Sequence, residues 1–215
     1  GWGEGDVFVV EADEFDRSFL QLHPRLALVT GIDAEHLDCY GDLAAVRRAF
    51  AQFLDRLPFY GQAILAGDNT GVQTLVADGE NNWLTYGLGS GNDYCAKDLT
   101  LRQWGSRFAA FKYGEELGSV ELRVPGEYNI CNALGAAAVA HSLGIDFDTV
   151  SAALRDFSGV ERRFERKGEV GGVLVVDDYA HHPVEIAAVL DAARRLDRRL
   201  IAVFQPHLYS RTQDL

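Results

Sequence analysis

The segment DDYAHHP, residues 177–183, brings two carboxyls, a phenol and two imidazoles into one short stretch of chain. Carboxylates and imidazoles hold and transfer protons, and they bind cations. An apolar run at 173–176 precedes the segment and an amphipathic run at 184–196 follows it, so we expect a strand before it and a helix after it. Open α/β sheets bind ligands at the carboxyl ends of their strands. A solvated turn more commonly carries Gly, Asn or Ser. We therefore interpret this segment as a site.

Two acidic clusters, EADEFD at 11–16 and DAEHLD at 33–38, also follow apolar runs. Hard divalent cations such as magnesium prefer oxygen ligands, often one or two carboxylates with phosphates and water. The first cluster taken alone is equally consistent with a solvated acidic loop, and a loop histidine such as His36, taken alone, is more often structural. Two neighbouring strands that both end in acid clusters favour a cation site.

Asn129 and Asn132 lie three residues apart at the start of an expected helix, so they share a face. Their side-chain amides offer both donor and acceptor groups and could contact the edge of a base. A pair of hydrogen bonds at the helix start is the alternative interpretation, and spacing alone favours it.

Two pairs of basic residues are candidates for binding anions. Arg162 and Arg163 follow an expected domain boundary, where two guanidinium groups entering a cleft would suit phosphate. His207 and Arg211 follow the apolar run at 200–204, where either could hold a carboxylate. Isolated surface arginines are common, so neither pair is specific by itself.

The elements that must position these residues are read from apolar patterning. Continuous apolar runs predict strands at 7–10, 26–30, 63–66, 173–176 and 200–204. Such runs are typical of a parallel sheet covered on both faces. Helices are predicted at 42–57 with Asp42 as N-cap, at 128–143, at 147–157 with Asp146 as N-cap, and after Pro183.

Between residues 83 and 124 the pattern changes to short alternating strands, such as 107–113 and 119–124. This pattern favours antiparallel strands that flank the parallel sheet. The predicted fold class is α/β, with a mainly parallel central sheet and flanking antiparallel strands. Residues 158–160 form the most plausible boundary, which gives domains at 1–159 and 160–215.

Composition narrows the function classes. The 215 residues carry 32 acidic and 20 basic side chains, a net charge of −12, which disfavours a nucleic-acid surface. The three cysteines form no CxxC pair, so neither a zinc knuckle nor a disulfide framework is indicated. No apolar stretch is long enough to cross a membrane, and the first residues do not resemble a secretory signal. We expect a cytoplasmic protein with no membrane partner.

Seven segments, taken in order, resemble those of the Mur ligases, the ATP-dependent amide-forming enzymes of peptidoglycan synthesis. The matching strings are VVEADEFDRSFL, VTGIDAEHLDCYGD, LPFYGQAILAGD, PGEYNICNALGAAAVA, GVERRFE, VVDDYAHHPVEI and FQPHLYSRTQDL. The resemblance runs from about Asp6 to Leu215. The string FQPHLYSRT favours members that join L-alanine to UDP-N-acetylmuramate over those that recycle murein peptides.

The resemblance implies that residues 1–159 belong to the central ATPase domain and residues 160–215 to the start of a Rossmann-like C-terminal domain. It implies ATP and Mg²⁺ as cofactors, an acyl phosphate intermediate, and UDP-N-acetylmuramate and L-alanine as substrates. The implied roles are magnesium binding by Glu11 and His36, adenine contact by Asn129 and Asn132, phosphate contact by Arg162 and Arg163, nucleotide contact by Asp178 and Tyr179, and amino-acid and carboxylate binding by His181, His182, His207 and Arg211. Arg163, His181 and His182 are the implied catalytic residues.

The sequence departs from the family pattern at several functional elements. The phosphate loop GxxxxGK[ST] does not occur in it, nor does a UDP-binding domain, and residues 1–96 contain no lysine that could be carbamylated. We therefore expect an inactive fragment that binds ATP poorly. Two alternatives are a metal-dependent hydrolase using Glu11, His36, His181 and His182, and a non-catalytic nucleotide-binding module. A phosphate loop encoded upstream of Gly1 would support the ligase.

Overall fold

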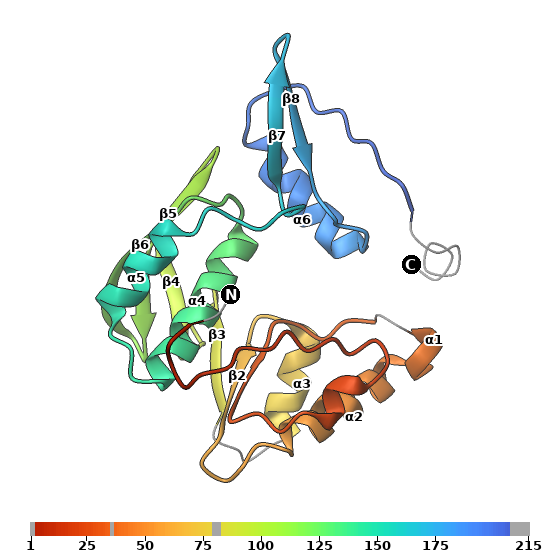
Figure 1. Cartoon of the computed structure of the whole chain (residues 1–215), viewed down its shortest axis with the longest axis vertical. Coiled ribbons are helices and arrows are strands. Elements are labelled where there is room, and N and C mark those ends of the chain that lie inside the picture. The colour runs from red at the N-terminus through yellow and green to blue at the C-terminus, as the bar shows by residue number, and fades with distance from the viewer. Residues whose placement is uncertain (1–2, 35–36, 79–82, 207–215) are drawn as a thin grey trace. The chain divides into compact units, whose positions relative to one another are not determined.

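The computed structural model describes residues 3–34, 37–78 and 83–206, and its strands there form two sheets (Figure 1). The larger sheet has the order β1-β2-β3-β4-β5-β6, and β7 and β8 form the smaller one. The strands are β1 Leu26–Val29, β2 Gln62–Ala66, β3 Trp83–Gly87, β4 Tyr94–Arg102, β5 Gly105–Lys112, β6 Glu115–Leu122, β7 Glu165–Val170 and β8 Val173–Asp177. The helices are η1 Ser18–Gln21, α1 Leu37–Tyr40, α2 Leu43–Leu54, α3 Thr70–Asp78, α4 Glu127–Ser142, α5 Phe147–Asp156 and α6 Pro183–Arg194.

The predicted α/β class is confirmed. Strand β1 pairs in parallel with β2, and β3 pairs in parallel with β4. Strands β4, β5 and β6 then form an antiparallel meander. The meander lies in the region where the sequence changes from continuous to alternating apolar residues, as expected. None of the helices in the described ranges is long and apolar enough to cross a bilayer.

The chain divides into two compact units, residues 1–84 and residues 85–215, and each is described by itself. In the first unit, Phe19 packs on Phe50 and Phe53 of α2, with ring centroids 5.4 and 5.1 Å apart. Asp42 is the N-cap of α2, as predicted, because its Oδ1 accepts the amide of Ala45 at 2.6 Å. Phe19 and Phe53 belong to the first unit's core, and Phe50 packs against it.

Asn69 fixes the loop that follows β1, a role that the sequence patterns did not reveal. Its Oδ1 accepts the amides of Ile32 at 3.2 Å and Val72 at 3.0 Å, which joins that loop to the first turn of α3. Gly71 is required there, since a Cβ at this position would lie 2.0 Å from the carbonyl oxygen of Ile32. The loop at the end of β1 is therefore held by one side chain and one close backbone approach.

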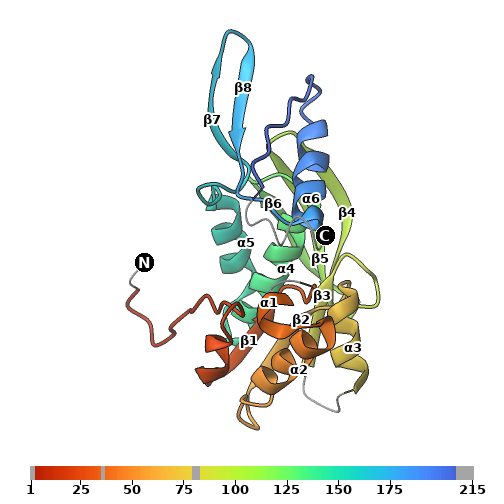
Figure 2. The ribbon, with the colours of Figure 1, turned by 90° about the vertical axis from the view of Figure 1, so that its right-hand side faces the viewer.

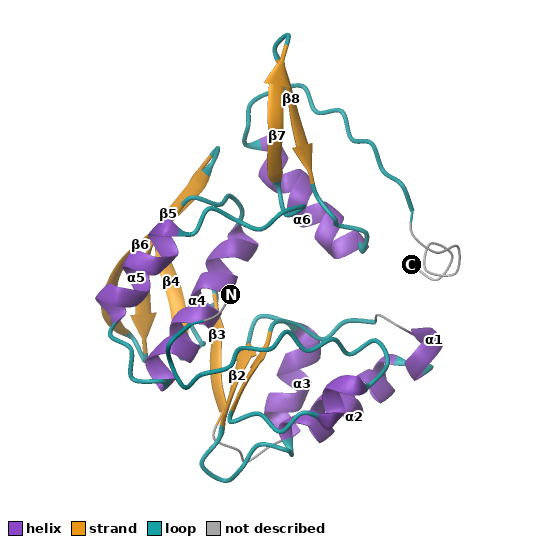
Figure 3. Ribbon diagram, viewed as in Figure 1, coloured by secondary structure: helices purple, strands orange, loops and turns teal. Residues whose placement is uncertain are grey.

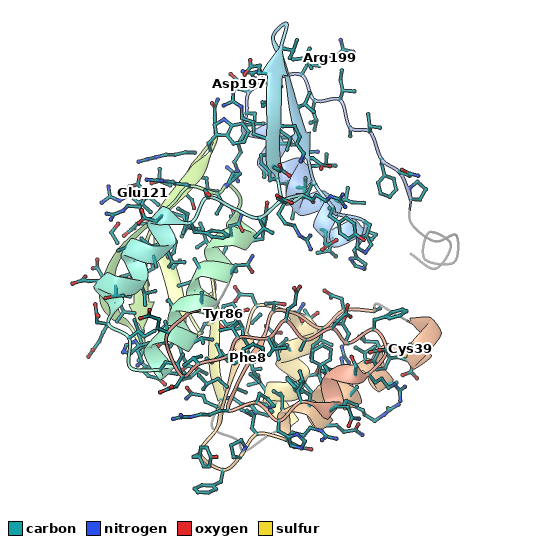
Figure 4. All side chains as sticks on the ribbon, viewed as in Figure 1. Phe8, Cys39, Tyr86, Glu121, Asp197 and Arg199 are labelled. Atoms are coloured by element: carbon teal, nitrogen blue, oxygen red, sulfur yellow. The ribbon has the colours of Figure 1, made fainter. Side chains whose placement is uncertain are left out.

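Two predicted strands are absent. Residues 7–10 and 200–204 are extended chain without strand pairing (Figure 3). Phe8 is 87% exposed and Val203 is 95% exposed, and the Phe8 side chain is labelled in Figure 4. The apolar patterning at both places suits a strand, but a strand also needs a neighbour to satisfy its backbone hydrogen bonds. Among the described residues neither segment has one.

In the second unit, the alanine-rich helix α4 is buried, as its composition predicted. Its Ile130 and Leu134 belong to the core together with Tyr94 of β4 and Phe108 of β5. Helix α5 follows with Asp146 as its N-cap, because Asp146 accepts the amide of Thr149 at 2.9 Å, again as predicted.

The predicted strand at 173–176 exists as β8, but its pairing differs from the expected parallel sheet. It pairs antiparallel with β7 in a hairpin, which projects beside α6 in the view of Figure 2. Val173 and Val175 of β8 are 63% and 51% exposed, respectively. Continuous apolar sequence predicted burial on both faces, and in the described chain this hairpin has no covering layer on that side. Helix α6 begins at Pro183, as expected.

Candidate functional site

The DDYAHHP segment lies where the sequence placed it, between β8, which ends at Asp177, and α6, which begins at Pro183. The connection is short, so its side chains are fixed by the strand end on one side and by the first turn of the helix on the other. Both histidines and Asp178 make hydrogen bonds in this connection. The segment is therefore an ordered turn with defined side-chain positions.

His182 is the N-cap of α6 and is only 6% exposed. The amide of Val184 donates to its Nδ1 at 3.4 Å, and Oε2 of Glu185 accepts the amide of His182 at 3.5 Å. This reciprocal arrangement is a capping box, which satisfies amides that the helix itself leaves unpaired. The structure thus gives His182 a role in positioning the helix start.

Glu185 joins three parts of the site. Besides the His182 amide, its Oε2 accepts the amide of His181 at 3.3 Å, and its Oε1 accepts from the guanidinium of Arg163 at 3.4 Å. Burial would raise the pKa of the Glu185 carboxyl, but the two backbone amides, Arg163 and His181 together lower it. A carboxylate at the N-terminus of a helix also interacts favourably with the helix dipole. Glu185 is therefore ionised when it orients Arg163.

The ring of His181 is held by its own loop. Its Nδ1 lies 3.0 Å from the carbonyl oxygen of Tyr179, and the two rings meet edge to face at 5.4 Å between centroids. A carbonyl only accepts, so the hydrogen-bonded Nδ1 carries the hydrogen and the basic lone pair is on Nε2. Nδ1 is also 3.8 Å from Oε2 of Glu185. His181 can thus act as a base or an acid through Nε2.

Asp178 connects the segment to residues 162–165. Its Oδ2 accepts the amide of Phe164 at 2.7 Å, and its Oδ1 accepts the amide of Ala180 at 2.7 Å. In addition, the amide of Tyr179 donates to the carbonyl of Arg162 at 2.8 Å. Arg162 and Phe164 both have left-handed backbone angles, with φ of 57° and 50°. Such angles are uncommon outside glycine, and these hydrogen bonds hold the strained turn in place.

The start of α4 lies against this turn. Burial raises the pKa of the Tyr128 phenol, the nearby Asp178 carboxylate raises it further, and Arg163 opposes the shift. The Tyr128 phenol therefore lies within electrostatic range of Asp178 and of Arg163. Asn129 donates from Nδ2 to the carbonyl of Pro125 at 2.7 Å, while Asn132 is exposed one turn later. Both asparagines are thus on the helix that meets Asp178 and Arg163.

The second unit therefore contains most of the predicted nucleotide and phosphate contacts. The residues that belong to it are Asn129, Asn132, Arg162, Arg163, Asp178, Tyr179, His181 and His182. Glu11 belongs to the first unit, where its side chain is exposed on extended chain. His36, His207 and Arg211 lie outside the described residues. Within the described ranges, no three His, Cys, Asp or Glu side chains are grouped as a metal site.

Two residues of the site were missed from the sequence. Glu185 stands three residues after the N-cap His182, which is the spacing of a capping box and could have identified it. Tyr128 had no such signal, because only the folding of residues 160–180 against α4 places Asp178 near it.

The chain matches two family models. Residues 3–140 match the Mur ligase middle domain, and residues 162–215 match the Mur ligase, glutamate ligase domain. Residues 141–161 lie between the two matched regions, whereas the compact units divide at residue 84. The division into domains at residues 159 and 160 stays a prediction.

Sequence relatives cover nearly the whole chain. A UDP-N-acetylmuramate–L-alanine ligase of Salinibacter ruber is 51% identical over 214 residues, which is 99% of this chain and 45% of that protein. One of Desulfosudis oleivorans is 50% identical over 215 residues, or 47% of its length. The chain thus spans about half the length of the curated relatives it matches.

A solved structure supports the same relationship. The UDP-N-acetylmuramate–alanine ligase of Thermotoga maritima aligns with a TM-score of 0.73 and 28% identity. The alignment covers 86% of this chain and 41% of that structure. The fold of the chain is therefore that of the Mur ligase middle and C-terminal domains.

Proposed function

This chain belongs to the Mur ligase family, and from that premise we propose that it serves the ATP-dependent ligation of L-alanine to the carboxylate of UDP-N-acetylmuramate. Two relatives with that name, at 51% and 50% identity over nearly the whole chain, support the choice of amino acid and acceptor. The proposed setting is the cytoplasm, in the synthesis of peptidoglycan precursors, and hence in cell-wall formation and cell division.

One structural observation carries the proposal: an arginine and a histidine are both oriented by Glu185 beside a helix start that bears two asparagines. Arg163 reaches Glu185 at 3.4 Å, and the amide of His181 reaches it at 3.3 Å. A guanidinium suits a transferring phosphoryl group, and an imidazole suits proton transfer from an amine. Asn129 and Asn132 offer the amide groups that adenine recognition needs.

The proposed reaction has two bond-forming steps. A carboxylate oxygen of UDP-N-acetylmuramate attacks the γ-phosphorus of ATP, which forms the acyl phosphate and releases ADP. The amine of L-alanine then attacks the acyl carbon, and the tetrahedral intermediate expels inorganic phosphate to leave the amide. Arg163 would stabilise the negative charge on the phosphoryl oxygens, since preorganised cationic groups act most strongly on such developing charge.

His181 is the better placed of the two histidines to reach a substrate, and His182 positions it. The buried ring of His182 caps α6, whereas His181 carries its basic lone pair on Nε2. In the proposed mechanism His181 accepts the proton that the amine loses on attack. His207 and Arg211 would bind the carboxylate of the amino acid, as the sequence resemblance implies.

Magnesium would be held in part by Glu11. Its carboxylate is exposed and supplies the oxygen donor that this cation prefers, so the residue fits the group. Magnesium bound with ATP phosphates would supply charge neutralisation for phosphoryl transfer. His36, the second proposed contributor, lies outside the described residues.

We propose that this chain alone binds ATP weakly and makes no amide. Its lysines are Lys97, Lys112 and Lys167, and none stands in a phosphate loop, whose lysine and backbone amides normally hold the phosphates. Calorimetry of the 215-residue chain with Mg-ATP should show no micromolar binding. Micromolar affinity would overturn this part, because phosphate binding would then not need the loop.

The reaction itself is tested on the complete gene product that contains this chain. Phosphate release should require ATP, UDP-N-acetylmuramate and an amino acid together, with L-alanine preferred over glycine and serine. A preference for a peptide in place of L-alanine would refute the proposed substrate. Arg163→Ala should lower kcat with little change in the secondary structure, while Arg194→Ala, an exposed arginine on the same unit, should leave kcat unchanged.

The alternatives make different predictions. A metal-dependent hydrolase would bind zinc or manganese stoichiometrically after purification, and a non-catalytic module would support no amide synthesis in the complete gene product. The family match favours the ligase over both.

A further inference from the structure

A cavity of about 550 Å³ opens at the end of the antiparallel meander, and no residue of the segment 177–183 lines it. Its walls come from the β4–β5 turn, the end of β6 and the last turn of α5. The lining residues are Arg102, Gln103, Trp104, Gly105, Glu121, Leu122, Arg123 and Arg155. Glu121 is labelled on this part of the second unit in Figure 4. The volume is within the range of about 300–1,000 Å³ typical of small-molecule sites.

The side chains that line this cavity carry a net positive charge, whereas the chain as a whole is negatively charged. Three arginines and one glutamate line it, although the chain has a net charge of −12. Arg102 is paired with Glu121 at 2.9 Å. The guanidinium groups of Arg123 and Arg155 make no ion pair or side-chain hydrogen bond with any residue that the structure describes. Two uncompensated guanidinium groups therefore share one concave surface.

The floor and one wall of the cavity are fixed. Gly105 packs so closely that a Cβ there would lie 2.3 Å from the carbonyl oxygen of Leu122, which holds the β4–β5 turn against β6. Trp104 packs on Phe164, with ring centroids 6.0 Å apart, and Arg166 lies over its ring at 5.7 Å. Arg166, which also pairs with Glu169 at 3.3 Å, thus lies on the ring of a residue that lines the cavity.

We propose that this cavity is a second anion-binding site, which takes a phosphate dianion between Arg123 and Arg155. Each planar guanidinium can donate two parallel hydrogen bonds to phosphate oxygens, a geometry that a single ammonium cannot supply. The close contacts of Gly105 with Leu122 and of Trp104 with Phe164 hold the wall formed by the β4–β5 turn, so ordering this wall adds little entropic cost to binding. Free pyrophosphate and an organic phosphate monoester present the same chemistry, and both are candidates for the ligand.

The site is distinct from the one proposed for nucleotide binding, because its lining residues do not include the segments 162–165 or 177–185; the two regions meet where Trp104 packs on Phe164. It does not depend on the proposed function. An exposed arginine pair is weakened by salt, so binding should fall as ionic strength rises.

The test is calorimetry of the 215-residue chain with inorganic pyrophosphate and, separately, with ribose 5-phosphate, at low and at physiological salt. We expect one saturable site, and the tighter of the two ligands identifies the source of the phosphate. The double variant R123A/R155A should weaken binding by about tenfold or more, because the charge-assisted hydrogen bonds are lost. The matched double variant R48A/R194A, which removes two exposed arginines elsewhere, should bind as the original chain does.

A second variant is expected to strengthen binding, and a misfolded protein could not give that result. E121Q removes the negative charge from the cavity and releases Arg102, so it should tighten pyrophosphate binding by about threefold or more. R163A, which alters the proposed nucleotide site, should leave pyrophosphate binding unchanged. Equal affinity in R123A/R155A and the original chain would overturn the proposal. Equal losses in R123A/R155A and R48A/R194A, or binding that is lost in R163A alone, would also overturn it.

Discussion

Replacement of Asp178 by alanine should release the turn at residues 162–165 from the candidate site. Asp178 accepts the amides of Phe164 and Ala180, each at 2.7 Å. The bond to Phe164 spans 14 residues of sequence, whereas the bond to Ala180 closes a local turn. Phe164 has a left-handed φ of 50°, a conformation that costs of order 1–3 kcal/mol unless its surroundings hold it. Without the carboxylate, the turn can relax.

The magnitude follows from the hydrogen bond to Phe164. A bond to a charged group contributes about 1.5–3 kcal/mol, and we take the lower end because Asp178 is only partly buried. A loss of about 1.4 kcal/mol corresponds to about a tenfold change in an equilibrium constant. The Phe164 amide should therefore exchange its hydrogen with solvent about tenfold faster in D178A.

Amide hydrogen exchange measured by NMR reports this local opening residue by residue. The variant D178N retains one acceptor oxygen and should give a smaller increase at one of the two amides. D191A removes an exposed carboxylate that pairs with Arg194 at 2.8 Å, and it should leave exchange at Phe164 unchanged. Unchanged exchange of Phe164 in D178A would refute the reasoning, and so would a uniform increase across the whole chain.

Three further predictions concern stability. His182→Ala should lower the free energy of unfolding by about 1 kcal/mol in urea because α6 loses its cap, whereas His182→Asn, which restores an N-cap, should recover most of that loss. Burial and the nearby ammonium of Lys112 lower the pKa of His141 below 6.5, so the unfolded chain binds this proton first. Stability should then decline as the pH falls below about 6.5, and H141N should show a smaller loss of Tm between pH 7.5 and pH 5.5 than the original chain. The pKa of Glu185 is lowered by backbone amides and by Arg163, so its contribution is present above about pH 4.5 and disappears in acid; E185Q should be less stable at pH 7 and should lose less stability on acidification.

Local sequence was sufficient for elements whose signals are short-range. Asp42 and Asp146 were predicted as N-caps because a carboxylate before a helical run accepts one of the first amides, and both do so. Pro183 was predicted at the start of α6 because its missing amide hydrogen costs nothing there. Alternating residues between 83 and 124 likewise predicted the antiparallel meander.

Strand prediction failed where it required a partner. Residues 7–10 and 200–204 have the same apolar pattern as β1 and β2. In the described chain β1 and β2 pair with each other, whereas residues 7–10 and 200–204 pair with no strand. Apolar patterning reports that a segment is suited to burial in a sheet. It carries no information about whether a neighbouring strand is present to complete the hydrogen bonds.

The sequence by itself determined the family, the α/β class and the identity of the chemical groups at 177–183, because these follow from residue type, order and spacing. The tertiary structure decided how those groups divide their work. In the folded chain His182 caps α6, Asp178 accepts the amide of Phe164, and Arg163 donates to Glu185. The tertiary structure also brings Arg123 and Arg155 to the same cavity, although they lie on different elements. Such roles depend on which backbone amides and charges lie within about 3 Å of a side chain, and contacts between segments distant in sequence arise only when the chain folds.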